Sequence, residues 1–149
     1  MRSLSAAFAF AVLGACGGSE AGGAGDGGPS SCTASEALET TPSKSGDYTV
    51  YVCDSAAPAR GFNTFTYLVV DKSGAPVDGL TLSVQPWMPD MGHGSPGNPQ
   101  VTPGADGLYQ VSNVVFTMPG VWQLRTTVSA PHPGTAPASD SANPQFNID

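Results

Sequence analysis

The chain has 149 residues, and its 12 acidic and 5 basic side chains give a formal net charge of −7. Because this field repels phosphate and few Lys or Arg side chains could release counterions, the charge argues against nucleic acid as a partner. Acidity does not by itself indicate a metal site, since a solvated acidic surface is its commoner cause.

Residues 1–15 are predicted to be a signal peptide. Arg2 precedes an apolar run over 4–13, which is shorter than the roughly 20 residues a spanning helix needs. Leu13-Gly14-Ala15-Cys16 resembles the lipobox of bacterial lipoproteins. The resemblance implies cleavage before Cys16 and a lipid on its sulfur, and thus a protein anchored to a bacterial membrane in the cell envelope, facing the periplasm or the exterior. The alternative is an ordinary secreted protein with Cys16 in or near its signal.

The next segment, 16–31, is almost entirely Gly, Ser, Ala, Asp and Glu, and it has no aromatic or branched aliphatic residue to bury. This composition predicts a flexible tether. The remainder, 32–149, has the length of one domain.

Within 32–149 the apolar residues alternate with polar ones, and Gly or Pro separates the alternating runs. Leu80, Leu82 and Val84, for example, share one face of a strand. The turn signals at 71–74 and 104–107 suit hairpin joints. The predicted strands are 48–53, 63–71, 80–85, 107–115, 121–129 and a short one at 146–148.

This pattern predicts an all-β fold, an immunoglobulin-like antiparallel β-sandwich of about six to seven strands. A small barrel is the alternative. The segment 32–40 could form one helical turn and no more. The Pro-rich stretch 131–144 is expected to be a mobile extended linker or edge segment, because proline lacks the N–H that a central strand requires.

Two cysteines remain if Cys16 carries a lipid. Cys32 and Cys53 would then be the only thiols of a protein in an oxidising compartment, so we expect them to form a disulfide. The bridge would close a loop of about twenty residues and contribute roughly 3 kcal/mol. A Cys/Cys metal site is the alternative, although no CxxC spacing or nearby histidine supports it.

The stretch 87–94, Trp-Met-Pro-Asp-Met-Gly-His-Gly, is predicted to be a loop that follows a strand ending near Pro86. It holds Met88, Met91 and His93. Thioether sulfur competes poorly for zinc or magnesium but well for Cu(I), and imidazole accepts copper in either oxidation state. The loop therefore predicts a copper site, with copper expected as Cu(I).

Two further residues could complete this site. Met118 lies in a second Met-Pro corner that could fold back beside the first, and His132 is a weaker candidate in the Pro-rich stretch. The structural alternative is that each Met fills a gap in the core or contacts Trp87 or Trp122, and that the loop histidine is solvated.

Three motifs follow one another along the chain: Met88-Pro-x-Met91-x-His93-Gly, Gly107-x-Tyr109 and Phe116-x-Met118-x-Gly120-x-Trp122. This order resembles the YtkA-like domain and the related FixH-like proteins. The resemblance implies an immunoglobulin-like sandwich on the outer side of a membrane and, through FixH-like members, a link to copper delivery or oxidase assembly. The resemblance also implies that the metal ligands are Met88, Met91, His93 and Met118. FixH-like proteins have a transmembrane N-terminal helix in place of the anchor and tether predicted here, so partnership with a membrane oxidase assembly complex does not carry over directly.

The sequence thus favours a lipoprotein that buffers copper or delivers it to a recipient protein. The alternative is a metal-independent interaction module that docks through an exposed Trp87 and Met88. An enzyme is not expected, because the chain has no GxSxG or HExxH motif and only two histidines.

Overall fold

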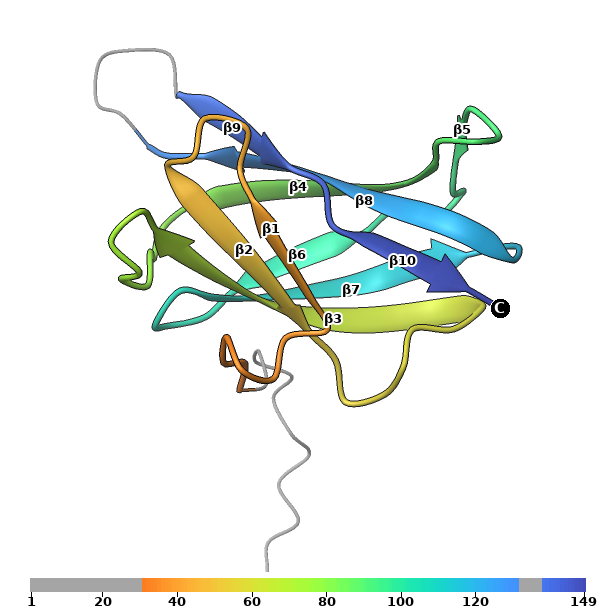
Figure 1. Ribbon diagram of the computed structural model, residues 1–149, viewed down its shortest axis with the longest axis horizontal. Helices are drawn as coiled ribbons and strands as arrows, with labels where there is room; N and C mark the ends of the chain where they lie inside the picture. Colours follow the sequence, from red (N-terminus) through yellow and green to blue (C-terminus); the bar gives the residue numbers. More distant parts are fainter. Residues whose placement is uncertain (1–30, 132–137) are drawn as a thin grey trace, which may run out of the picture.

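The computed structural model describes residues 31–131 and 138–149, and every regular element in these two ranges is a β-strand. Two antiparallel sheets of five strands pack face to face (Figure 1), so the prediction of an all-β sandwich is confirmed. The strands outnumber the six or seven expected. Within these ranges no helix has the length and apolar character needed to cross a membrane.

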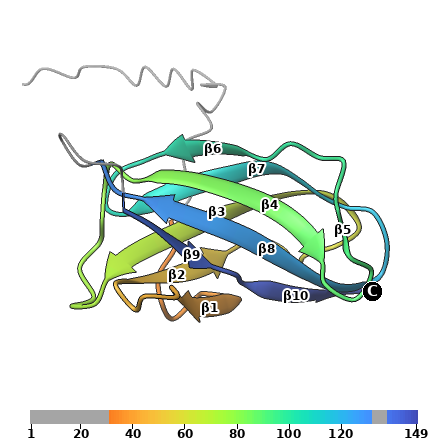
Figure 2. The ribbon, with the colours of Figure 1, turned by 90° about the horizontal axis from the view of Figure 1, so that it is seen from above.

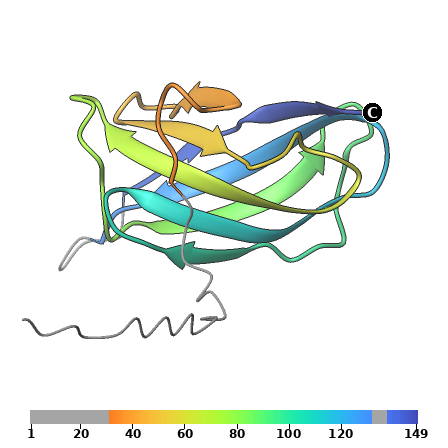
Figure 3. The ribbon, with the colours of Figure 1, turned by 90° about the horizontal axis from the view of Figure 1, so that it is seen from below.

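The first sheet has the strand order β1-β2-β3-β7-β6 (Figure 3). Its long central strand β3 pairs with β2 on one side and β7 on the other, with a register shift between Asn63 and Phe65. The bounds are β1 Glu39–Pro42, β2 Tyr48–Cys53, β3 Gly61–Asp71, β7 Leu108–Phe116 and β6 Gln100–Pro103.

The second sheet has the order β10-β8-β4-β5, and β9 also pairs with β8 (Figure 2). Its central strand β8 therefore has β4 on one side and both β9 and β10 on the other. The bounds are β4 Thr81–Met88, β5 His93–Gly94, β8 Gly120–Ser129, β9 Ser139–Ala142 and β10 Gln145–Ile148.

The core lies between the sheets and is built from the alternate side chains that each strand turns inward. Phe65 of the first sheet stacks on Phe146 of the second with ring centroids 5.4 Å apart. The hydroxyl of Tyr109 donates to the carbonyl of Val77 (2.8 Å) and accepts from the N–H of Leu80 (3.0 Å). This phenol therefore fixes the crossover from β3 to β4.

The predicted disulfide is present. Cys32 and Cys53 are joined by an S–S bond of 2.05 Å across a sequence separation of 21. Both residues are buried. The alternative of a Cys/Cys metal site is wrong, because the two sulfurs are bonded to each other.

The six predicted strands all exist, and β2 has the predicted bounds. One boundary was wrong: β4 does not end near Pro86 but continues to Met88. Proline is tolerated there because the N–H that it lacks would point away from β8, so the ladder between β4 and β8 loses no hydrogen bond. The carbonyl of Pro86 accepts from the N–H of Ser95 (3.1 Å).

Four strands were not predicted: β1, β5, β6 and β9. The segment 32–40 contains a single turn closed by the Glu36 N–H on the carbonyl of Thr33, with no helix. Of the stretch 131–144, which was predicted to be a mobile extended linker or an edge segment, residues 139–142 form the edge strand β9. The prolines of that stretch lie outside β9, so they remove no donor from its ladder with β8.

Candidate metal site

The predicted loop is the tip of a β-hairpin. Trp87 pairs with Gly94 and Met88 with His93, which leaves 89–92 to make the turn. The N–H of Gly92 donates to the carbonyl of Met88 (2.9 Å). Gly92 has φ +67, a left-handed conformation that glycine adopts without a steric penalty.

Met88 lies in the core and not on a solvent-facing loop. It continues the inward-facing series Leu82, Val84 and Pro86, and only 3 % of its surface is exposed. A Cβ on Gly120 would lie 2.8 Å from the Met88 Cε, so the absence of a side chain at Gly120 makes room for this methyl group. Part of the structural alternative therefore holds, because Met88 does fill space in the core.

His93 is the direct cross-strand neighbour of Met88, so both side chains lie on the same face of the hairpin. The half-buried imidazole meets the Trp122 ring edge-on, with centroids 6.4 Å apart. Its Nδ1 lies 3.1 Å from the carbonyl oxygen of Gly94. Because a carbonyl only accepts, this hydrogen bond requires a proton on Nδ1, so in the neutral imidazole the Nε2 lone pair is the one available to a metal.

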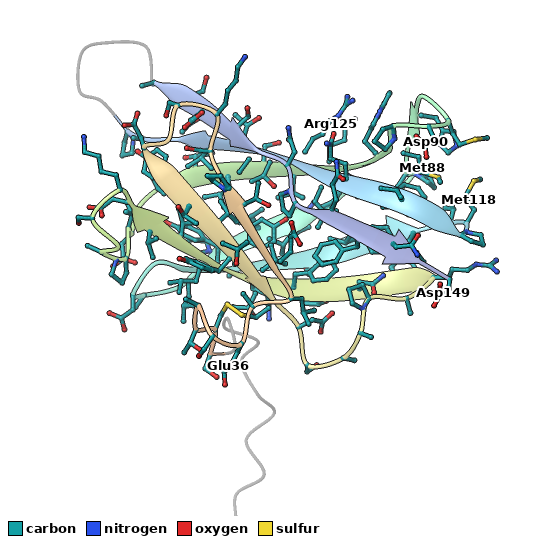
Figure 4. All side chains as sticks on the ribbon, viewed as in Figure 1. Glu36, Met88, Asp90, Met118, Arg125 and Asp149 are labelled. Carbon is teal, nitrogen blue, oxygen red and sulfur yellow. A yellow bond between two sulfur atoms is a disulfide. The ribbon has the colours of Figure 1, made fainter. Side chains whose placement is uncertain are left out.

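Met118 reaches the same end of the sandwich from the turn between β7 and β8. It is half-buried against the core. Its carbonyl accepts a hydrogen bond from the Trp122 indole N–H (2.9 Å), which holds this Met-Pro corner in place. Figure 4 shows Met88 and Met118 at the end of the molecule that also carries Asp90 and the C-terminal Asp149. We call Met88, His93 and Met118, with Trp122 beneath them, the Met/His end.

Met91 is not packed with this group. It lies in the hairpin turn with 61 % of its surface exposed. The structure therefore places three of the four predicted ligands at the same end of the sandwich and leaves the fourth exposed in the hairpin turn. Cys16 and His132 lie outside the described residues.

Sequence reasoning did not single out Gly120 and Trp122 as parts of the site. Gly120 gives Met88 its space, and Trp122, with no exposed surface, lies against His93 and holds the Met118 corner. The signal was present in the sequence as Met-Pro-Gly-x-Trp, which places the indole four residues after the methionine whose carbonyl it binds.

The donors at the Met/His end differ from those of zinc or magnesium sites. Among residues 31–131 and 138–149, no group of three or more His, Cys, Asp or Glu side chains could hold a metal ion. Two thioethers and one imidazole nitrogen would make a neutral donor set of soft and borderline ligands. The residues present therefore fit a soft ion better than a hard one.

A hollow of about 480 Å³ lies away from this end, beside the disulfide. Its lining includes Glu36, Asp54 and Thr66. Glu36 is far from Met88 and Met118 in Figure 4. The hollow therefore contributes nothing to the Met/His end.

The fold and this end define an all-β sandwich with a methionine- and histidine-bearing tip. A sequence model described as YtkA-like matches residues 42–127, and the chain belongs to the YtkA-like family. The resemblance proposed from the sequence is thereby confirmed, and membership indicates an envelope protein of a broad kind. No curated protein and no solved structure matches the chain.

Proposed function

We propose that this protein is an envelope lipoprotein that binds copper as Cu(I) at the Met/His end, and that it buffers the ion or delivers it to a recipient protein. The observation that carries the proposal is the pairing of Met88 with His93 across the hairpin, with the Met118 corner held at the same end by Trp122.

The donor chemistry supports Cu(I). Thioethers from Met88 and Met118 and the free Nε2 of His93 carry no net charge, and they are the soft and borderline ligands that Cu(I) accepts. The exposed Met91 supplies a third thioether where an ion would arrive from solvent. Ligand exchange at thioethers needs no removal of a proton from sulfur, which suits transfer to another protein.

The location is part of the same proposal. A lipid on Cys16 and the tether over 16–31 would hold the sandwich close to a membrane while leaving the Met/His end free to meet a recipient. The proposal assigns no catalytic step to the protein.

The test is a competition titration with Cu(I) against a calibrated chelator, under anaerobic conditions with ascorbate so that the disulfide stays intact. We expect stoichiometric binding by the unaltered protein. The variants M88L, M91L and M118L keep the side-chain volume and remove the sulfur, and H93Q removes the imidazole. Since loss of an outer-shell partner already costs about 10- to 100-fold in metal affinity, loss of Met88, Met118 or His93 should cost at least about tenfold.

The matched control is H132Q, which removes the other imidazole and should leave the affinity unchanged. A smaller loss is expected for M91L, because this side chain is not packed with the other donors. Affinity that is equal in all variants and the unaltered protein would overturn the proposal, as would binding no stronger than background.

The alternative function, a metal-independent interaction module, loses one of the two side chains proposed to dock, because Met88 is buried. Trp87 is partly exposed, and the guanidinium of Arg125 lies over its ring, 4.2 Å from the centroid. If the titration finds no Cu(I) binding, this alternative is the function that remains, with Met91 and its turn as the surface to examine.

A further inference from the structure

The hollow beside the disulfide lies on the outer face of the first sheet. Phe65 and Tyr67 point into the core, so Thr66 between them points outward. Cys53 and Gln110 are its direct cross-strand neighbours on β2 and β7, and all three residues line the hollow. The volume of about 480 Å³ lies within the roughly 300 to 1,000 Å³ of small-molecule sites.

One wall of the hollow is the turn over 33–36, which is fixed in place. The bond between Cys32 and Cys53 ties the start of this turn to β2. The Glu36 N–H donates to the carbonyl of Thr33 (3.0 Å), and the Thr33 hydroxyl donates to the Glu36 carboxylate (2.8 Å). The carboxylate at this wall is therefore oriented before any ligand arrives.

Thr66 has a buried hydroxyl that the fold does not use. Only 6 % of the residue's surface is exposed, and its hydroxyl has no hydrogen-bond partner among the residues that the structure describes. Every fully enclosed side-chain nitrogen or oxygen in those residues does have a partner, so this hydroxyl is not fully enclosed and opens into the hollow. Because a buried polar group without a partner costs free energy, this hydroxyl points to a ligand that supplies one.

The charges around the hollow indicate what kind of ligand it would accept. Two carboxylates line it, Glu36 and Asp54, and no Lys, Arg or His of the described residues does. The Oδ1 atom of Asp54 accepts from the Ala56 N–H (3.3 Å), whereas no described residue donates to its Oδ2. This lining favours a positively charged ligand that donates hydrogen bonds. The hollow is too large for a bare metal ion, and the described residues hold no group of three metal-binding His, Cys, Asp or Glu side chains.

We propose that the hollow binds a small hydroxylated amine with the size and chemistry of an amino sugar. Its ammonium group pairs with the carboxylates of Asp54 and Glu36, and one of its hydroxyls forms a hydrogen bond with the hydroxyl of Thr66. The site is separate from the proposed copper site, because Glu36 lies far from Met88 and Met118 (Figure 4). The two proposals therefore stand or fall independently.

A titration of the full chain with glucosamine, followed through its backbone amide NMR signals, tests the proposal. We expect saturable shifts in the signals of β2, β3 and the turn over 33–36. Glucose has the same ring with a neutral hydroxyl in place of the ammonium group. It should bind at least about tenfold more weakly, because it cannot make the charge-assisted hydrogen bonds.

Three variants identify the residues. E36Q and D54N each remove one carboxylate charge and should weaken glucosamine binding about tenfold. T66V removes the hydroxyl at nearly constant shape and should also weaken binding. Since this hydroxyl has no partner in the fold, T66V should keep its midpoint of urea denaturation. The matched control is D90N, which removes the same charge far from Glu36 (Figure 4) and should bind as the unaltered protein does.

Several results would overturn the proposal. One is the absence of saturable shifts with glucosamine, and another is glucose binding that is equally tight. A third is affinity of D54N and T66V for glucosamine equal to that of D90N. Loss of stability in T66V would also count against it, because the hydroxyl would then serve the fold and not a ligand.

Discussion

The backbone around Gly107 leaves no room for a side chain. It has φ +72, and its N–H donates to the Asp78 carboxylate (2.7 Å). A Cβ at this position would lie 2.6 Å from the carbonyl oxygen of Val69 and 3.0 Å from the Pro76 Cβ. The turn before β7 therefore needs glycine for its conformation and also for its packing against β3.

We expect G107A to lower the free energy of unfolding by about 3 kcal/mol, through left-handed strain together with a backbone clash. The matched control is G74A, at φ +84 with open space around the added Cβ, which should cost only about 1 kcal/mol. Urea denaturation of both variants measures the difference. Equal losses would show that the close approach at Gly107 costs nothing beyond the left-handed strain.

At the scale of the elements, Asp140 on β9 joins this edge strand to the turn between β1 and β2. The N–H and hydroxyl of Ser45 both donate to its carboxylate. Partial burial raises the pKa of Asp140, but hydrogen bonds from Ser43, Ser45 and the N–H of Ser141 outweigh this effect and lower the pKa to about 2. The carboxylate therefore stabilises the docking of β9 only while it is ionised.

The pH dependence of D140N follows from that pKa. A carboxyl group with a lowered folded pKa contributes its full stability above its unfolded pKa of about 3.9 and loses it as the pH falls through about 2. We expect D140N to be less stable than the unaltered protein at pH 7, and the difference to vanish near pH 2. Thermal unfolding across this range measures it, with D90N at the exposed hairpin turn as control. A difference that stays constant from pH 7 to pH 2 would contradict the assignment.

The strands that sequence reasoning found are those with a two-residue alternation of apolar side chains. β1, β6 and β9 have the sequences Glu-Thr-Thr-Pro, Gln-Val-Thr-Pro and Ser-Asp-Ser-Ala, and they bury too little apolar surface to show such an alternation. They are short strands that pair with a neighbour on one side only. Their existence depends on the hydrogen-bonding groups of β2, β7 and β8, which no local pattern encodes.

The sequence predicted which residues belong to the candidate site, but not how these residues are arranged. The alternation of Leu82 and Val84 continues through Pro86 to Met88, so the burial of Met88 was encoded in the sequence. Proline was taken as the end of the strand because it lacks an N–H, and Pro86 is acceptable in β4 only because that N–H would point away from β8. That Met118 and His93 lie at the same end depends on Trp122, which contacts the segments of both, and such a contact between distant segments lies beyond sequence patterns.

At the scale of the whole molecule, the disulfide joins Cys32, near the start of the described chain, to Cys53 and so closes a loop. We expect replacement of Cys32 and Cys53 by alanine to lower the free energy of unfolding by about 3 kcal/mol, because the unfolded chain regains the freedom of a closed loop. Chemical denaturation of the unreduced proteins measures this change. A reductant should destabilise the unaltered protein by a similar amount and leave the double variant unchanged; if the reductant affects both equally, the bridge is not the cause.

The bridge also determines how the sandwich would carry a mechanical load. A force applied to residue 31 reaches Cys32 and passes through the sulfurs into Cys53, at the end of a strand that β3 holds along its length. Without the disulfide, the same force would be transmitted along the backbone into β1. It would then separate β1 from β2 one residue pair at a time, beginning with Glu39 and Val52. A domain pulled by its N-terminal segment would thus resist at its second strand, and its first strand would bear no load.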